Sequence, residues 1–480
     1  LRTYGGISGF PKREESIYDV VTCGHSSTSI SIALGLACGR DLKGENNKVI
    51  AVIGDGSLTA GLALEGINNA GHLDKNLIII LNDNEMSISE NVGALSSYLS
   101  RILTGQFYTR FRKDIEKILL SIPRIGSSLL KIAKRAEEMM KSIITPGIIF
   151  EELGLKYVGP INGHDINNLI ETFKNLKNLD GPVLVHCYTK KGKGYKPAED
   201  EAEFFHGVPP FDKETGRILK QKETSFTDIF GETLTKLADE DQRIVAVTAA
   251  MRSGTGLKYF AEKHKDRFFD VGIAEQHAVT FSAGLALEGF RPFVAIYSTF
   301  LQRSFDMIIH DVCLQNLPVC FAIDRAGLVG EDGPTHQPVE HIMSLRLIPD
   351  FKVIRPADFY ETLAAWKLIL KSSFPSALLL TRQKVNTLFD YRDIINSNFS
   401  KGGYLLISHK SPDLVLVASG SEVHIAIEVS KLLMNKNIKA NVVSAPCVEL
   451  LRKNDKEYFS NRRQKKTVRQ LYFAVCFSGR

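Results

Sequence analysis

Two apolar segments of the sequence each end in a polar group that suits cation binding. Asp55, which stands between two glycines, follows the run Val49–Ile53, and Asn84 follows the run Leu77–Leu81, 29 positions after Asp55. That spacing fits two neighbouring parallel strands joined by a crossover helix, which we expect over Thr59–Ala70. Since functional groups of parallel sheets gather at the carboxyl ends of the strands, Asp55 and Asn84 should lie side by side.

The chemistry of these residues favours a metal ion and a diphosphate. Carboxylate and amide oxygens are hard ligands of the kind Mg²⁺ prefers, and Mg²⁺ often takes only one or two of them from protein and the rest from phosphates and water. Gly54 and Gly56 would let backbone N–H groups approach a diphosphate closely. The alternative is a plain Gly-Asp-Gly turn together with a loop asparagine.

A second candidate is the segment Gly24–Ser29, which precedes an apolar helix expected over Ile30–Ala37. Serine and threonine are good N-cap residues, so helix capping alone is one interpretation. The functional interpretation adds His25 as a polar contact to a ligand at the start of the helix.

Glu275 stands just before an apolar helix expected over His277–Leu287. The helix is apolar on most faces and should be buried, which would place the carboxyl group in a low-dielectric setting. A buried carboxyl group has a raised pKa and can share a proton with a ligand nitrogen. The alternative is that Glu275 only stabilises the helix N-terminus with its charge.

Aromatic and basic residues follow other expected strands. Tyr297, Phe300 and Arg303 come directly after one strand, where an aromatic ring is usually core but can also stack on a heterocycle. A glycine-bounded loop follows another expected strand, and a further expected strand ends in a basic residue. These two segments add side chains suited to binding a hydroxylated, phosphorylated substrate and to moving protons. Together they describe a site shared by two α/β domains. These further residues are Arg325, Asp332, His336 and Arg382.

The elements that must position these residues alternate strands with helices, which predicts an α/β fold with parallel sheets. Residues 1–220 form a first domain, with a basic helical excursion over 94–146, and residues 225–390 form a second. A third strand–helix pattern, over 400–480, is short for a domain. The expected strands of the second domain are Ile244–Thr248, Arg291–Ile296, Pro318–Ile323 and Ala377–Leu380.

The composition is that of an ordinary globular protein. The 480 residues are 44% hydrophobic and 24% charged, and the net charge of +6 is spread along the chain, which does not favour nucleic acid. Seven cysteines without a CxxC pair indicate reduced thiols in a cytosol-like compartment. No apolar run approaches the ~20 residues of a membrane span. We therefore expect a cytoplasmic protein, or a plastid one if a transit peptide lies upstream.

The longer motifs resemble those of the 1-deoxy-D-xylulose-5-phosphate synthases, a family of transketolase-type thiamine diphosphate enzymes. From Glu331 onward the sequence is more similar to transketolase proper, and residues 461–480 resemble neither group. The resemblance implies tandem thiamine diphosphate-binding domains, diphosphate-binding then pyrimidine-binding, and a truncated third α/β domain. It also implies that the first domain is N-terminally incomplete. The matching segments are Gly5–Arg13, Gly24–Ser29, Leu81–Ser89, Gly159–His164, Lys191–Tyr195, Asp270–His277, Tyr297–Arg303 and Asp324–Gly327.

The resemblance also assigns roles to individual residues. Asp55 and Asn84 are implied to bind Mg²⁺, while Glu275 pairs with the aminopyrimidine ring of the cofactor and Phe300 stacks on it. Other cofactor contacts are implied for Gly24, His25, Ser26, Gly56, Ser57, Asn84 and Tyr195. The implied catalytic residues are Glu275, His206 and His336. The implied substrate contacts are Tyr297, Arg303, Arg325, Asp332, His336 and Arg382.

The activity implied is the condensation of pyruvate with glyceraldehyde 3-phosphate to 1-deoxy-D-xylulose 5-phosphate and CO2. This is the first step of the non-mevalonate isoprenoid route and also serves thiamine biosynthesis. A homodimer is implied, with no nucleic-acid or membrane partner. Two alternatives stay open: a transketolase that moves a two-carbon ketol unit between sugar phosphates, and an inactive truncated homologue.

Overall fold

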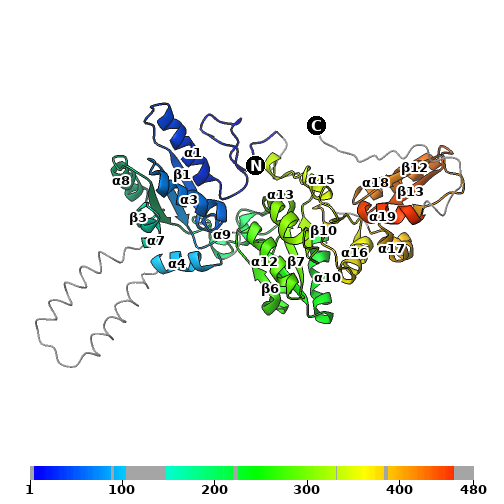
Figure 1. Cartoon of the computed structure of the whole chain (residues 1–480). Helices are drawn as coiled ribbons and strands as arrows, with labels where there is room; N and C mark the ends of the chain where they lie inside the picture. Colours follow the sequence, from blue (N-terminus) through cyan, green and yellow to red (C-terminus); the bar gives the residue numbers. More distant parts are fainter. Residues whose placement is uncertain are drawn as a thin grey trace, which may run out of the picture. The chain divides into compact units, whose positions relative to one another are not determined.

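The computed structural model describes residues 5–87, 91–103, 147–208, 210–219, 225–330, 332–382 and 387–458, with only the backbone of 455–458. The contacts between residues group the chain into two compact units (Figure 1). The N-terminal unit contains the described residues of 25–221 and 272–274. The C-terminal unit contains those of 5–24, 222–271 and 275–458. The greater part of the predicted excursion over 94–146 lies outside the described residues, as do residues 461–480.

The N-terminal unit is built on a four-stranded parallel sheet in the order β1-β2-β4-β3. The predicted neighbouring pair is confirmed, because Gly54 at the end of one strand is in register with Asn82 near the end of the next. The strands are β1 (Ile50–Gly54), β2 (Ile78–Asp83), β3 (Lys156–Asn162) and β4 (Val183–Tyr188). The helices are α1 (Ser29–Leu42), α2 (Asp55–Leu58), α3 (Gly61–Leu73), α4 (Ala94–Leu103), α7 (Ile148–Glu152), α8 (Ile166–Leu176) and α9 (Lys196–Asp200), with a 3₁₀ turn over Phe204–His206.

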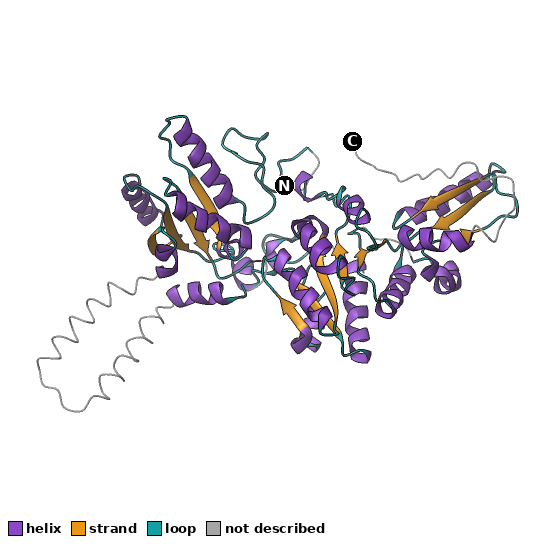
Figure 2. Cartoon of the chain, in the orientation of Figure 1, coloured by secondary structure: helices purple, strands orange, loops and turns teal. Residues whose placement is uncertain are grey.

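The two faces of this sheet bury different helices, which Figure 2 shows as coils beside the orange strands. Side chains alternate along a strand, so Ile79 and Leu81 of β2 join the core with α1 and α3. Ile78 and Ile80 belong to a second cluster that includes Leu176 of α8. The polar residue that continues the first set, Asp83, is therefore carried to the buried end of the α1–α3 face.

Two predicted helices differ from the observed ones. The helix expected over Thr59–Ala70 is α3, which begins at Gly61 and continues to Leu73. A separate helical turn, α2, precedes it, because the chain becomes helical at Asp55 as soon as β1 ends. The helix expected to end at Ala37 continues to Leu42. Arg40 allows this continuation, because its buried guanidinium donates hydrogen bonds to the carbonyl oxygens of Asn47 and Asn76.

The C-terminal unit contains a six-stranded parallel sheet in the order β6-β5-β7-β8-β10-β9, close to the predicted strands. The strands are β5 (Ile244–Thr248), β6 (Phe268–Asp270), β7 (Arg291–Tyr297), β8 (Cys320–Asp324), β9 (Lys352–Ile354) and β10 (Ser376–Leu379). The helices are α10 (Phe226–Glu240), α11 (Lys258–Lys263), α12 (Glu275–Leu287), α13 (Ser298–Leu301), α14 (Phe305–Met307), α15 (His341–Arg346), α16 (Phe359–Lys371) and α17 (Arg392–Asn398). A π-helical turn covers Ile308–Cys313, and 3₁₀ turns cover Lys265–Arg267, Gln302–Ser304, Pro334–His336, Phe389–Tyr391 and Phe399–Lys401.

A three-stranded sheet in the order β11-β13-β12 completes this unit. It shares one hydrophobic core with the six-stranded sheet, and buried polar contacts cross between them. Glu361 of α16 accepts hydrogen bonds from the hydroxyl groups of Tyr404 and Ser444, both at 2.5 Å. The elements are β11 (Tyr404–Ile407), β12 (Leu414–Ala418), β13 (Ala440–Ser444), α18 (Glu422–Met434) and α19 (Val448–Tyr458).

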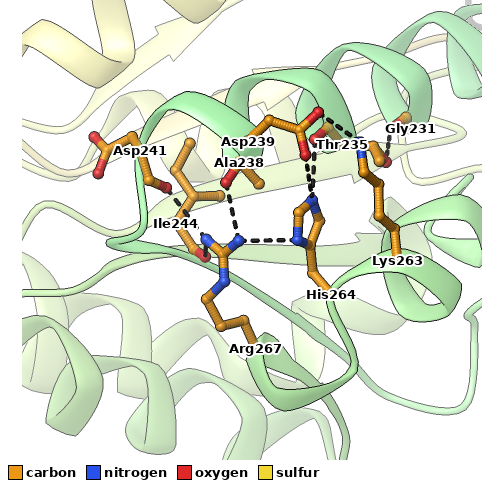
Figure 3. Close-up of polar contacts among 9 residues, drawn as sticks. All are labelled: Gly231, Thr235, Ala238, Asp239, Asp241, Ile244, Lys263, His264 and Arg267. Atoms are coloured by element: carbon orange, nitrogen blue, oxygen red, sulfur yellow. Dashed lines mark hydrogen bonds and ion pairs between the residues drawn. The ribbon is translucent and has the colours of Figure 1, made fainter.

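Arg267 secures the C-terminal end of α10 (Figure 3). Its guanidinium donates to the carbonyl oxygens of Ala238, Asp241 and Ile244 at 2.9, 3.2 and 3.1 Å. The same group lies 2.9 Å from Nδ1 of His264, and Arg can only donate, so Nδ1 is the acceptor. These hydrogen bonds satisfy carbonyl groups that the end of α10 leaves unpaired, and they connect α10 to the start of β5.

In the described part of the chain, none of the helices has the length and apolar character needed to cross a membrane. The cysteines that the structure describes are all free thiols, in agreement with the prediction from their spacing.

Candidate functional site

The predicted metal position in the N-terminal unit is a buried carboxyl group. Asp55 begins α2 directly after β1, is 3% exposed, and accepts a hydrogen bond from Nδ2 of Asn91 at 2.7 Å. Burial, together with a hydrogen bond to Asp83 and the charge of that residue, raises the pKa of Asp55. Burial alone would raise the pKa of Asp83 too, but hydrogen bonds from His186 and Asp55 outweigh it and lower that pKa. Two carboxyl groups are therefore in contact in a buried setting, where a second negative charge is unfavourable.

Asn84 lies at the end of the neighbouring strand, as predicted, and begins a tight turn. Its Oδ1 accepts the backbone N–H of Met86 at 3.1 Å, while Asp83 accepts that of Glu85 at 3.1 Å. Glu85 has a φ of +60°, which is uncommon for a residue with a side chain. The side chain that reaches Asp55 is that of Asp83, a residue to which the sequence interpretation gave no role.

The segment that carries His25 and Ser26 is joined to α2. The hydroxyl group of Ser27 donates to the carbonyl oxygen of Ser57 at 2.8 Å. Thr28 is the N-cap residue of α1 but makes no side-chain capping hydrogen bond, so capping does not explain this serine-rich segment. His25, Ser26 and Ser57 are thus brought to one edge of the sheet.

Gly56 is closely enclosed at the same edge. A Cβ atom at this position would lie 2.6 Å from Cβ of Ser87 and 2.8 Å from Oδ1 of Asn91, distances that real side chains do not adopt. The observed packing requires glycine here.

These groups fit a divalent cation and a diphosphate. Two buried carboxyl groups in contact attract positive charge, and hard oxygens are the ligands that Mg²⁺ prefers. In the described part of the chain no cluster of three or more His, Cys, Asp or Glu side chains suits a metal ion.

Two other predicted residues of this unit, His206 and Tyr195, lie near a basic loop. The ammonium group of Lys191 contacts the carbonyl oxygen of Ser87 and lies 3.0 Å from Nδ1 of His206. Burial lowers the pKa of Lys191, and the charge of Asp55 opposes this effect. Tyr195 packs its ring against Phe205, and its hydroxyl group donates to the carbonyl oxygen of Lys213 at 2.9 Å.

In the C-terminal unit, Glu275 is buried as predicted. It is the first residue of α12 and is 2% exposed, and burial raises its pKa. Its Oε2 atom lies 3.9 Å from the guanidinium of Arg303. A protonated carboxyl group can donate to a ligand nitrogen, while its position in the first helical turn also agrees with the alternative of helix stabilisation.

An aromatic cluster lies in the same unit. The Phe300 ring meets His336 edge to face at 5.4 Å, and His336 stacks on Phe10 at 4.6 Å. Gly24 packs against the same loop, since a Cβ atom there would lie 2.1 Å from Oγ1 of Thr335. The residues before His25 therefore support the loop that carries His336.

The predicted substrate residues form two pairs. The guanidinium of Arg325 lies 3.6 Å from the centre of the Tyr297 ring, and Arg382 Nη1 donates to Asp332 at 3.2 Å. Arg325 also donates to the carbonyl oxygen of Gly254 at 3.2 Å. Planar guanidinium groups suit phosphate, so this arrangement can receive a phosphorylated substrate.

Comparisons with known proteins identify the family of the chain. Residues 1–189 match the family model described as 1-deoxy-D-xylulose-5-phosphate synthase. Residues 222–387 match the transketolase pyrimidine-binding domain, and residues 402–472 the transketolase-like C-terminal domain. A 1-deoxy-D-xylulose-5-phosphate synthase of Geobacter sulfurreducens is 52% identical over 453 residues, 94% of this chain and 72% of the relative. The chain belongs to the 1-deoxy-D-xylulose-5-phosphate synthase family.

A second relative extends the same match. The synthase of Syntrophotalea carbinolica is 53% identical over 92% of this chain and 70% of its own. Among solved structures, transketolase of Campylobacter jejuni is 23% identical, with a TM-score of 0.47, over 92% of this chain and 73% of that one. Family membership makes the chain a transketolase-type, thiamine diphosphate-dependent transferase, and the predicted α/β fold is confirmed.

Sequence reasoning missed several residues at the site. Asp83 could have been found from strand periodicity, because it continues the buried positions Ile79 and Leu81. His186 is a histidine inside an otherwise apolar expected strand, which is a signal for a paired polar group. Ser27 and Asn91 carry no such signal, because their contacts join segments distant in the sequence.

Proposed function

We propose that this chain condenses pyruvate with D-glyceraldehyde 3-phosphate to give 1-deoxy-D-xylulose 5-phosphate and CO2. The observation that carries the proposal is the 52% identity to a synthase of that name over 94% of the chain. We also propose a homodimer, as in the family that the sequence resembles.

The N-terminal unit would hold the cofactor through its diphosphate. Asp55 and Asn84 would be the ligands of Mg²⁺, whose charge would offset that of the buried carboxyl groups. Gly56 would offer its backbone N–H to the diphosphate, and Lys191 adds positive charge near this edge. The other proposed cofactor contacts are Gly24, His25, Ser26, Ser57, Asn84 and Tyr195.

The C-terminal unit would orient the cofactor ring. Glu275 is buried, so it can hold a proton and give it to a ring nitrogen of the aminopyrimidine. Phe300 would stack on the ring, because its partners Tyr297 and His336 already order it. When bound, thiamine diphosphate supplies an electron sink for the bond-breaking and bond-making at the substrate.

Charged and polar side chains would bind the acceptor and the donor. Arg325 and Arg382 would bind the phosphate of the aldehyde, and Arg303 would lie near the cofactor ring through its approach to Glu275. Tyr297 and Asp332 would contact the acceptor hydroxyl groups. His206 and His336 would move protons, a task for which histidine is suited near neutral pH.

A donor assay tests this function. Pyruvate with glyceraldehyde 3-phosphate should release CO2 and form the five-carbon product. A ketose phosphate with an aldose phosphate should give no transfer. Ketol transfer without CO2 release would instead establish the transketolase alternative. Two of the three matching family models describe transketolase domains, which is why this alternative is tested.

A binding assay tests the third alternative, that the chain is an inactive homologue. Calorimetric titration of thiamine diphosphate with Mg²⁺ should give saturable binding to the chain. Asp55→Asn should abolish it, whereas failure of the unaltered chain to bind would support the inactive homologue.

A further inference from the structure

A line of polar side chains, buried for most of its length, leads from the edge strand β3 of the N-terminal sheet to the predicted cation ligand. The hydroxyl group of Tyr157 lies 2.7 Å from Nδ1 of His186, and Nε2 of His186 lies 2.9 Å from Oδ2 of Asp83. His186 and Asp83 are 0% and 1% exposed. The three residues come from neighbouring strands β3, β4 and β2, and Asp83 in turn contacts Asp55.

The hydrogen bonds of this line have one direction. A carboxylate only accepts, so Nε2 of His186 carries the proton and donates to Asp83. Burial raises the pKa of Tyr157, which keeps its hydroxyl group a donor. Nδ1 of His186 is then the acceptor, and both bonds point toward Asp83. Such aligned bonds polarise one another and fix the orientation of the final carboxylate.

Asp83, held in this orientation, contacts the surroundings of both predicted cation ligands. One of its oxygens is held by His186 and the other accepts the N–H of Glu85, which fixes the turn that begins at Asn84. The same carboxyl group is hydrogen-bonded to Asp55. We propose that Asp83, oriented by His186 and Tyr157, is a positioning residue that sets Asp55 and Asn84 for a divalent cation and its diphosphate. This inference rests on the proposed function.

Stability of the sheet alone is a poor explanation of the line. Burying a carboxylate and an imidazole costs free energy that their hydrogen bond need not offset, and apolar side chains of the same volume often stabilise a core as well. A purely structural role would therefore not need the line.

The test measures cation affinity rather than turnover. Mn²⁺ serves as the probe, and its free concentration is followed by electron paramagnetic resonance with excess thiamine diphosphate and folded protein at 20 °C. Tyr157→Phe, which removes only one hydroxyl group, should weaken Mn²⁺ binding several-fold. His186→Leu should weaken it about 10-fold or more. His186→Gln, which keeps an N–H for Asp83, should recover part of the loss.

Tyr98→Phe is the matched control. Tyr98 lies on α4 and packs against the same core as Tyr157, and the substitution removes the same hydroxyl oxygen. It should bind Mn²⁺ as the unaltered chain does. Equal weakening in Tyr98→Phe and Tyr157→Phe, or no recovery in His186→Gln, would show a general packing effect and overturn the inference. Unchanged affinity in Tyr157→Phe and His186→Leu, with loss in Asp55→Asn, would overturn it while leaving the proposed function intact. Absence of binding in the unaltered chain would overturn the proposed function and this inference together.

Discussion

The guanidinium of Arg325 stacks on the ring of Tyr297, 3.6 Å from its centre, at the carboxyl edge of the six-stranded sheet. Arg325 has a φ of +55°, and its backbone N–H donates to Asp324 at 2.6 Å. Asp324 is buried and also accepts a hydrogen bond from Thr227 at 2.6 Å. The arginine is thus held from both its backbone and its side chain before any substrate arrives.

This relationship predicts the effect of Arg325→Lys. Lysine keeps the charge but loses the planar group that stacks on Tyr297 and binds phosphate through two N–H groups. The KM for glyceraldehyde 3-phosphate should rise about 10-fold or more, since a stacked cation contributes about 1–2 kcal/mol. Steady-state kinetics with pyruvate saturating measures this.

Arg392→Lys is the control for the same exchange. Arg392 lies 5.6 Å from the centre of the Tyr360 ring and belongs to α17, which contains none of the predicted substrate residues. Its KM should match that of the unaltered chain. A similar rise in both variants would assign the effect to a global change.

Glu275→Gln should separate binding from chemistry. Glutamine has nearly the same shape as the buried carboxyl group but cannot hold and release a proton there. The kcat should fall by about 10²-fold or more, as expected for loss of a group that transfers a proton. Calorimetry should show thiamine diphosphate still bound. The exposed residue Glu262 offers the control Glu262→Gln, which should leave kcat unchanged.

The parts of the fold that the sequence predicts well are those with a strong local signal. The strand ends at Gly54 and Asp83 follow from apolar runs, and their parallel pairing follows from the spacing. Helix limits are less certain, because a tertiary contact decides them. Arg40 lets α1 continue only because distant carbonyl groups receive its N–H groups.

The candidate site shows the same division. The apolar helix after Glu275 predicts burial and a raised pKa for this residue, and the structure has both. The apolar run before Asp55 predicts its place at a strand end, which the structure also has. Partners are harder to predict, since they depend on the register of strands far apart in the sequence. Asp83 meets His186 only because β2 and β4 are neighbours, although 103 positions separate them.

Glu361 predicts a pH dependence of stability in the C-terminal unit. Burial raises the pKa of Glu361 from 4.5 to about 7, against hydrogen bonds from Ser444 and Tyr404 that lower it. The folded protein therefore binds this proton more tightly than the unfolded chain. The resulting stability is fully present below pH 4.5 and is lost as the pH rises through about 7. The contribution is about 3 kcal/mol.

Glu361→Gln should remove that dependence. The amide imitates the protonated carboxyl group, because the hydroxyl groups of Tyr404 and Ser444 can accept as well as donate. The difference in unfolding free energy between variant and unaltered chain, from urea titrations at pH 5 and pH 8, should favour the variant only at pH 8. Glu428→Gln, an exposed change on α18, should show no such difference. A pH-independent difference for Glu361→Gln would contradict the assignment.

Arg267→Ala should destabilise the C-terminal unit through the end of α10. The substitution leaves the carbonyl oxygens of Ala238, Asp241 and Ile244 without a charged donor, and each such bond is worth up to about 1.5–3 kcal/mol. Partial access of water should reduce the total loss to about 2–3 kcal/mol, measured as a lower urea midpoint with an unchanged slope. Arg243→Ala is the neighbouring control, because Arg243 is exposed and pairs with the side chain of Asp241 at the surface. Such pairs contribute at most about 1 kcal/mol, so equal losses in the two variants would show that the carbonyl contacts of Arg267 do not stabilise the helix end.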